Sequence, residues 1–127
     1  MKLQPWLKRV ILVLFTVFTL FSFATGIMAQ DGPQLPPATQ SGMAPVNDIE
    51  MYYATYGDPT NPALFLLHGG LGNADYFVNQ IPAFAEQYYV VTADSRGHGR
   101  SAMSEQQIGY ALMASDVLAL MDYLKID

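Results

Sequence analysis

Five apolar residues, Ala63 to Leu67, are followed at once by a histidine and two glycines in the stretch ALFLLHGGLGN. The run is bounded by Pro62 and Gly69, is too short for a helix and does not alternate, so it predicts a strand covered on both faces. Gly69, Gly70 and Gly72 are expected to supply positive φ values and a close backbone approach in a sharp turn. This feature predicts an α/β fold in which a buried strand ends in a glycine-rich turn.

Further strands are predicted on either side. Apolar residues alternate from Ile49 to Tyr53 after the turn-forming pair Asn47-Asp48, so we expect a hairpin there. The stretch YYVVTA, Tyr88 to Ala93, predicts a second buried strand.

Two helices are predicted between and after these strands. Residues Tyr76 to Gln87 show helical spacing that is interrupted by Pro82, so we expect an irregular first turn and a short helix that restarts with Pro82 at its first position. Residues Tyr110 to Lys125 predict a helix with one apolar stripe, and Asp116 and Asp122 lie off its centre. The stripe consists of Tyr110, Met113, Val117, Leu120 and Leu124. The order strand, strand, helix, strand, helix predicts an α/β sheet with parallel central strands.

Residues 1–29 have the pattern of a targeting segment. Basic residues precede an apolar stretch, Val10 to Ala24, and the small Ala29 stands before Gln30, which is the order of a secretory signal peptide cleaved near Ala29. The uncharged run from Val10 to Gln30 is also long enough to span a bilayer, so a membrane anchor through Val10 to Met28 is the alternative. We therefore expect an exported protein, periplasmic or extracellular, or a membrane-anchored protein that faces out.

Composition divides the rest of the chain at residue 45. Residues 30–44 are rich in proline, glycine and small polar residues and predict a linker, and residues 45–127 are expected to form the folded part. Beyond Ala29 there are three basic and eleven acidic residues, a formal charge of −8, which argues against nucleic acid as a partner. The chain has no cysteine, which excludes disulfides, thiolate metal sites and a cysteine nucleophile.

In an open α/β sheet, ligands collect beyond the carboxyl ends of the strands, and both glycine-rich segments follow such ends. The segments LFLLHGGLGN and YYVVTADSRGHGRS, in this order and spacing, resemble the amino-terminal half of the α/β-hydrolase fold over residues 46–127. The resemblance implies that Gly70, the residue after His-Gly, donates a backbone N–H to an oxyanion hole, with Leu71 as the neighbouring candidate. It implies a hydrolase acting on an ester, a lactone or a similar small molecule by a Ser-His-Asp mechanism without a cofactor. Relatives with the same turn cleave epoxide, carbon–halogen or carbon–carbon bonds.

The sequence does not contain the nucleophile motif of that family. The motif is Gly-x-Ser-x-Gly after the fifth strand, and the acid and histidine follow later. Past the linker the serines are Ser95, Ser101, Ser104 and Ser115. Only Ser101 has a glycine two residues before it, and Met103 stands where the second glycine is needed. We therefore expect an amino-terminal fragment whose triad lies beyond Asp127, and we expect these 127 residues alone to be inactive and poorly folded.

Seven residues are expected to organise the two glycine-rich segments structurally: His68, Gly69, Asp94, Arg96, Gly97, Gly99 and Ser101. A neutral imidazole can bond two backbone groups, so His68 is expected to hold its turn. In the second segment, Asp and Ser side chains bond nearby backbone N–H groups and glycines supply positive φ. For Arg96 we also consider a second role as a charge beside a pocket. His98 is expected to face solvent or to be structural, and no metal site is expected because neither histidine has a partner at ligand spacing.

Two other classes of protein fit part of the sequence. Residues Gly97 to Ala102 match Gly-x-Gly-x-x-Ala, and Asp116 follows the first glycine by nineteen residues, near the spacing of a dinucleotide-binding fold. Against this, Asp94 to Arg96 separate the motif from the strand, and residues 103–109 show no helical pattern. The other alternative is a non-catalytic binding module of hydrolase fold, since a fold does not fix function.

Overall fold

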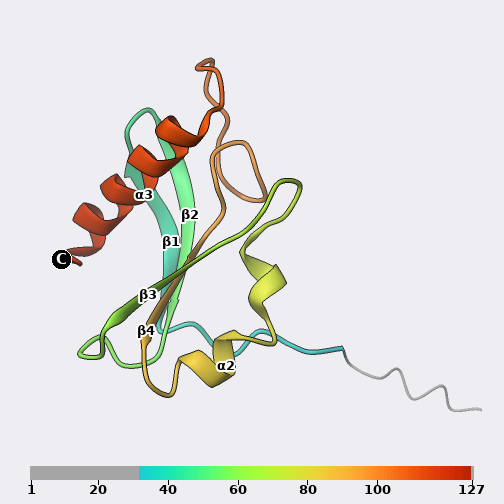
Figure 1. The fold of residues 1–127 in the computed structure, drawn as a ribbon, viewed down its shortest axis with the longest axis vertical. Helices are drawn as coiled ribbons and strands as arrows, with labels where there is room; N and C mark the ends of the chain where they lie inside the picture. The colour runs from blue at the N-terminus through green and yellow to red at the C-terminus, as the bar shows by residue number, and fades with distance from the viewer. Residues whose placement is uncertain (1–31, 127) are drawn as a thin grey trace, which may run out of the picture. The chain divides into compact units, whose positions relative to one another are not determined.

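A computed structural model describes residues 32–126, which contain a four-stranded sheet with the order β1-β2-β4-β3 (Figure 1). The strands are β1 (Gln40–Val46), β2 (Ile49–Tyr56), β3 (Ala63–Leu67) and β4 (Tyr89–Ala93). β1 pairs with β2 and β2 with β4 in antiparallel fashion, whereas β3 and β4 run parallel. This arrangement is the predicted partial α/β sheet with its parallel strand pair.

The β1–β2 hairpin turns at Asn47-Asp48, as predicted, and Asn47 has a φ of +47°, a conformation that asparagine tolerates well. β1 begins at Gln40, so the predicted linker of residues 30–44 is wrong over its last five residues. The proline and glycine content concealed a strand because β1 is an edge strand, where Pro45 can lie without breaking the ladder.

The helical elements are η1 (Ala74–Phe77), a 3-10 turn, and the helices α2 (Ile81–Phe84) and α3 (Tyr110–Leu124). The predicted irregular turn followed by a short helix is confirmed, with Pro82 at the second helical position instead of the first. α3 ends at Leu124, where Lys125 adopts a left-handed conformation.

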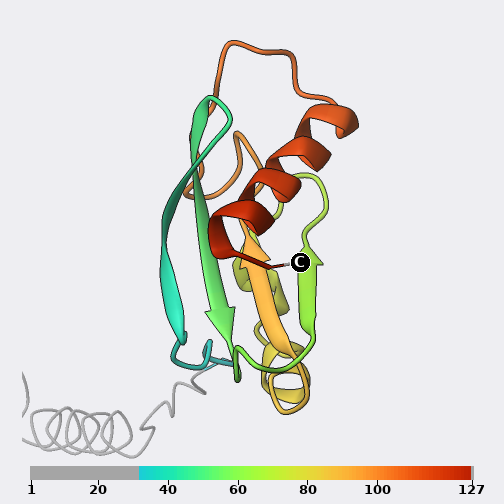
Figure 2. The ribbon, with the colours of Figure 1, turned by 90° about the vertical axis from the view of Figure 1, so that its left-hand side faces the viewer.

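Helix α3 lies on one face of the sheet and α2 on the other (Figure 2), and each face has its own apolar cluster. On one face, Tyr53 of β2 and Val91 of β4 pack with Leu120 of α3. On the other face, Val90 of β4 packs with Ile81 of α2, and Phe77 of η1 contacts the same cluster. The alternation along β2 and β4 thus directs successive side chains to opposite helical layers.

The apolar stripe predicted on α3 is only partly correct. Leu120 is fully buried and Met113, Val117 and Leu124 are half-buried, but Tyr110 is 92% exposed. Asp116, predicted to lie off the centre of the stripe, is fully buried. Burial of a carboxylate at this position requires a charged partner, which the loop after β4 supplies as described below.

Within residues 32–126, no helix combines the length and the apolar character needed to cross a membrane. The predicted signal peptide or anchor of residues 1–29 lies outside the described residues.

Candidate functional site

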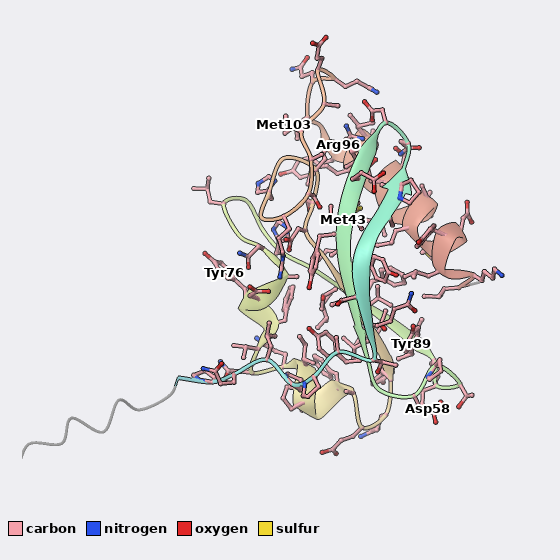
Figure 3. All side chains as sticks on the ribbon, turned by 180° about the vertical axis from the view of Figure 1, so that it is seen from behind. Met43, Asp58, Tyr76, Tyr89, Arg96 and Met103 are labelled. Carbon is pink, nitrogen blue, oxygen red and sulfur yellow. The ribbon has the colours of Figure 1, made fainter. Side chains whose placement is uncertain are left out.

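Two segments meet at the carboxyl ends of the parallel strands. They are residues 68–73 after β3, here called the β3 turn, and residues 94–101 after β4, here called the β4 loop. Because Leu67 pairs with Ala93 in the parallel register, the two segments leave the sheet side by side. Figure 3 shows Arg96 and Met103 at this end of the sheet and Asp58 and Tyr89 at the opposite end.

The imidazole of His68 joins two backbone groups. Its Nε2 accepts a hydrogen bond from the N–H of Ser95 at 2.9 Å, and its Nδ1 lies 2.8 Å from the carbonyl oxygen of Gly69. A backbone N–H can only donate, so Nε2 is unprotonated and the Nδ1–H donates to Gly69. His68 therefore sits between the β3 turn and the β4 loop as a neutral ring.

The expectation that Gly69, Gly70 and Gly72 supply positive φ values in the β3 turn is wrong. The positive φ, +62°, belongs to Leu71, whose side chain is 96% exposed. The N–H of Gly72 donates to the carbonyl of Gly69 at 3.2 Å, so Leu71 occupies the third position of a β-turn, where glycine or asparagine is usual. Of the three glycines, only Gly72 shows the predicted close backbone approach, because a Cβ there would stand 3.1 Å from the carbonyl oxygen of Gly69.

The backbone N–H groups of Gly70 and Leu71 have no hydrogen-bond partner within residues 32–126. A Cβ at Gly70 would meet no atom within 4 Å, so the space around this residue is open. Two donors at the end of a strand are thus available to an external acceptor.

The carboxylate of Asp94 organises the β4 loop. It is fully buried and accepts hydrogen bonds from the N–H of Ala74 and from the backbone and guanidinium of Arg100, at distances from 2.7 to 3.1 Å. Burial alone would raise the pKa of Asp94, but the hydrogen bonds from Arg100 and Ala74 outweigh it, so the pKa lies below its usual value. Arg100 also pairs with Asp75 and lies 3.6 Å from the ring centroid of Tyr52.

Gly97, Gly99 and Ser101 also have structural roles in the β4 loop. Gly97 and Gly99 have φ values of +70° and +51°, a region that favours glycine. The hydroxyl of Ser101 accepts from the N–H of Tyr52 and donates to the carbonyl of Asp94. This serine therefore joins the loop to β2, and its hydroxyl is engaged on both sides.

Arg96 lies in the interior, so the hypothesis that it is a charge beside a pocket is wrong. Its side chain is fully buried and binds both carboxylate oxygens of Asp116 at 2.6 and 2.7 Å. The guanidinium also donates to Ser104 at 2.7 Å and to Asp48 at 3.1 Å. Hydrogen bonds with Asp116 raise the pKa of Arg96, and those with Arg96 lower the pKa of Asp48. Sequence reasoning missed Asp48 and Asp116, although an acidic residue within a half-apolar helix is itself a signal of a buried partner.

A cleft of about 350 Å³ opens beside the β3 turn. Its walls are His68, Gly69, Gly70, His98, Ile108, Gly109, Tyr110 and Met113. His98 is half-buried, its ring centroid lies 5.3 Å from that of His68, and its Nδ1 lies 3.0 Å from the carbonyl oxygen of Arg96. The cleft is therefore bordered by the turn, two imidazoles and apolar residues at the start of α3.

The described residues do not support the dinucleotide-binding alternative. The segment Gly97 to Ala102 folds as turns, and α3 starts only at Tyr110, so no helix N-terminus stands behind the motif. Asp116, the residue at ribose-binding spacing, is buried in its pair with Arg96. Within residues 32–126, no group of three or more acidic, histidine or cysteine side chains is placed to hold a metal ion.

Comparison with known proteins gives a consistent similarity. The family model of the alpha/beta hydrolase fold matches residues 62–127. The 3-oxoadipate enol-lactonase 2 of Acinetobacter baylyi is 34% identical over 79 residues, which cover 62% of this chain and 30% of that protein. The soluble epoxide hydrolase of a Corynebacterium species is 37% identical over 84 residues, which cover 66% of this chain and 29% of that protein.

A solved structure shows the same similarity in three dimensions. The crystal structure of the enol-lactonase from Burkholderia xenovorans matches with a TM-score of 0.61 and 31% identity, over 66% of this chain and 33% of that one. The chain thus spans about 30% of the length of the curated relatives named above.

Proposed function

Because this chain belongs to the alpha/beta hydrolase fold family, we propose that it supplies the oxyanion-hole turn of a hydrolase. The observation that carries the proposal is the β3 turn, where the N–H groups of Gly70 and Leu71 are unpaired within residues 32–126 and Gly70 borders a cleft. Donors that are already aimed at a developing oxyanion stabilise the transition state by about 3 to 4 kcal/mol each.

The proposed substrate is an ester, a lactone or a similar small carbonyl compound. Two similar proteins are named enol-lactonases, and in a lactone the carbonyl oxygen becomes an oxyanion when a nucleophile attacks. Epoxide opening is the second candidate, favoured by the 37% identity with a soluble epoxide hydrolase. Turnover of p-nitrophenyl acetate compared with that of a simple epoxide separates the two chemistries.

We further propose that the nucleophile, acid and base of a Ser-His-Asp triad lie outside the 127 residues. None of the serines stands in Gly-x-Ser-x-Gly, and Ser101 is engaged by Tyr52 and Asp94. These 127 residues alone are then expected to give no ester turnover above the buffer rate. A downstream coding sequence with the serine replaced would favour the non-catalytic binding module instead.

Gly70 offers a sharp test of the oxyanion turn. It occupies the second position of the turn closed by Gly69 and Gly72, where proline is favoured, so Gly70→Pro removes one N–H donor while suiting the turn. We expect kcat on p-nitrophenyl acetate to fall about 100- to 1000-fold in the full-length hydrolase. Gly70→Ala is the matched control, because it keeps the N–H and its Cβ meets no atom within 4 Å. Equal kcat in the two folded variants would remove Gly70 from the oxyanion hole.

We also propose export of the protein through residues 1–29, supported by the basic residues, the apolar stretch and the small residue before Gln30. Intact-mass measurement on secreted material is expected to give a chain that begins at or near Gln30. Recovery of the uncut chain in the membrane fraction would favour an anchor through Val10 to Met28.

A further inference from the structure

Two consecutive residues of the β4 loop hold the two ends of the β3 turn. At the first residue of the turn, the Nε2 of His68 accepts the N–H of Ser95 at 2.9 Å. Directly after its last residue, the N–H of Ala74 donates to Oδ1 of Asp94 at 2.7 Å. Asp94 and Ser95 follow directly after β4, so hydrogen bonds attach both ends of the β3 turn to the carboxyl end of that strand.

The attachment at Asp94 is the more rigid of the two. The N–H of Asp94 donates to the carbonyl of Tyr52 on β2 at 3.0 Å, and Arg100 covers the fully buried carboxylate. A change at Asp94 would therefore disturb a buried charge as well as the turn. His68 is half-buried and uncharged, so the attachment there can be altered with less damage to the fold.

Between its ends, the turn makes mainly internal backbone hydrogen bonds. The N–H of Gly72 donates to the carbonyl of Gly69, and the carbonyl of Asn73 accepts from the N–H of Tyr76 at the start of η1. The N–H groups of Gly70 and Leu71 have no partner within residues 32–126, so no hydrogen bond of their own sets their direction. Their aim depends on where the two ends of the turn are held.

We propose that His68 is a positioning residue that fixes the direction of the Gly70 N–H. The inference rests on the proposed function, because that function gives the Gly70 N–H its acceptor. The neutral ring ties the carbonyl of Gly69, the residue next to the donor, to the N–H of Ser95. Loss of this tie leaves the turn held by the pairing of Leu67 with Ala93 at one end and by Asp94 at the other.

Two amide substitutions at His68 separate this role from simple packing. The side-chain oxygen of glutamine can reach the place of Nε2 and accept from Ser95, whereas the shorter asparagine places its polar atoms near the place of Nδ1. Both amides are neutral and polar, but glutamine keeps the hydrogen bond to Ser95 and loses the one to Gly69, whereas asparagine can keep the one to Gly69 and loses the one to Ser95. Thermal melts of the two variants serve to check that both are folded.

The experiment uses the full-length hydrolase of the proposed function and two readouts. Amide hydrogen exchange over residues 68–75 reports the turn without requiring activity. For His68→Asn we expect faster exchange in this segment and a kcat lower by roughly 10- to 100-fold with little change in KM, because a misplaced donor weakens transition-state binding more than substrate binding. For His68→Gln, which keeps the bond to Ser95 and loses the one to Gly69, we expect smaller changes in both values than for His68→Asn.

The outcomes separate this inference from the function on which it rests. Unchanged exchange in a folded His68→Asn variant, or equal loss of kcat in both variants, overturns the positioning role. Faster exchange in His68→Asn alone, in a protein that turns over no ester or epoxide, supports the tie between the turn and Ser95 and overturns the proposed function. Faster exchange with a selective loss of kcat supports both.

Discussion

Gly99 lies against the carboxylate of Asp94 with a φ of +51°. A Cβ at this position would overlap the Asp94 carboxylate and come within 3.0 Å of the Cβ of Asn73. Both the backbone conformation and the space therefore require glycine. The requirement matters for the site, because Asp94 holds the end of the β3 turn through Ala74.

Replacement of Gly99 by alanine is expected to destabilise the protein. The strained φ and the contact with the Asp94 carboxylate should together lower the free energy of unfolding by about 1 to 3 kcal/mol, measured by urea denaturation. Gly42→Ala is the control, because a Cβ there meets only the Tyr53 ring at an ordinary 3.8 Å, and its effect is expected to stay within about 0.5 kcal/mol. Similar losses in the two variants would contradict the requirement at Gly99.

Helix α3 is held at the carboxyl end of the parallel strands by an ion pair and hydrogen bonds as well as by apolar contacts. Asp116 accepts from Arg96 of the β4 loop and, at 2.7 Å, from the side chain of Asn47 in the β1–β2 hairpin. One carboxylate thus joins a helix, a loop and a hairpin that are far apart in the sequence. Its partner Arg96 also reaches the half-exposed Asp48, so each charged side chain of the network has a partner of opposite charge.

Asp116→Ala tests this network. The substitution leaves the buried Arg96 with only the half-exposed Asp48 as a charged partner, so the free energy of unfolding should fall by roughly 3 to 5 kcal/mol. Asp122→Ala, at an exposed position of the same helix, should change it by less than about 0.5 kcal/mol. Chemical denaturation of both variants measures the difference, and a small effect of Asp116→Ala would mean that apolar packing alone places α3.

For the molecule as a whole, we expect the paired carboxylates Asp48 and Asp94 to contribute to the response to acid. Arg96 lowers the pKa of Asp48, and hydrogen bonds from Arg100 and Ala74 hold the pKa of the buried Asp94 below its usual value. A carboxyl whose pKa is lower in the folded state stabilises that state above its unfolded pKa of about 4, and the stabilisation is lost as the pH falls through the folded value. We expect these two groups to leave stability unchanged between about pH 7 and 5 and to reduce it below about pH 4.

The substitution Arg100→Gln tests this expected response to acid. Without the guanidinium, only the backbone N–H groups of residues 74 and 100 oppose the effect of burial, so the pKa of Asp94 should rise and the loss of stability should begin at a higher pH than in the unmodified protein. Thermal melts across the pH range measure the shift. An acid transition at the same pH in both proteins would show that the pairing with Arg100 does not govern it.

Local pattern was sufficient for most of the elements, with β1 as the exception. The bounds of β3, the turn of the β1–β2 hairpin and the extent of α3 follow from short apolar runs, an alternation and a helical period, all of which act between residues close in the sequence. The resemblance of the two glycine-rich segments to the α/β-hydrolase fold also lay in contiguous residues, and the family match over residues 62–127 agrees with it.

What the sequence by itself determined was therefore the class of fold, the order of its elements and the place where strand ends meet. Only the tertiary structure decided that β1 starts at Gln40, that Leu71 takes the positive φ, and that Asp116 turns inward to Arg96. Each of these depends on groups beyond the near neighbours: Gln40 pairs with Thr55 of β2, the ends of the turn that contains Leu71 bind Ser95 and Asp94, and Asp116 binds Arg96 of the β4 loop. Propensity and periodicity describe near neighbours, whereas buried charge and backbone strain are set by groups that meet only when the chain is folded.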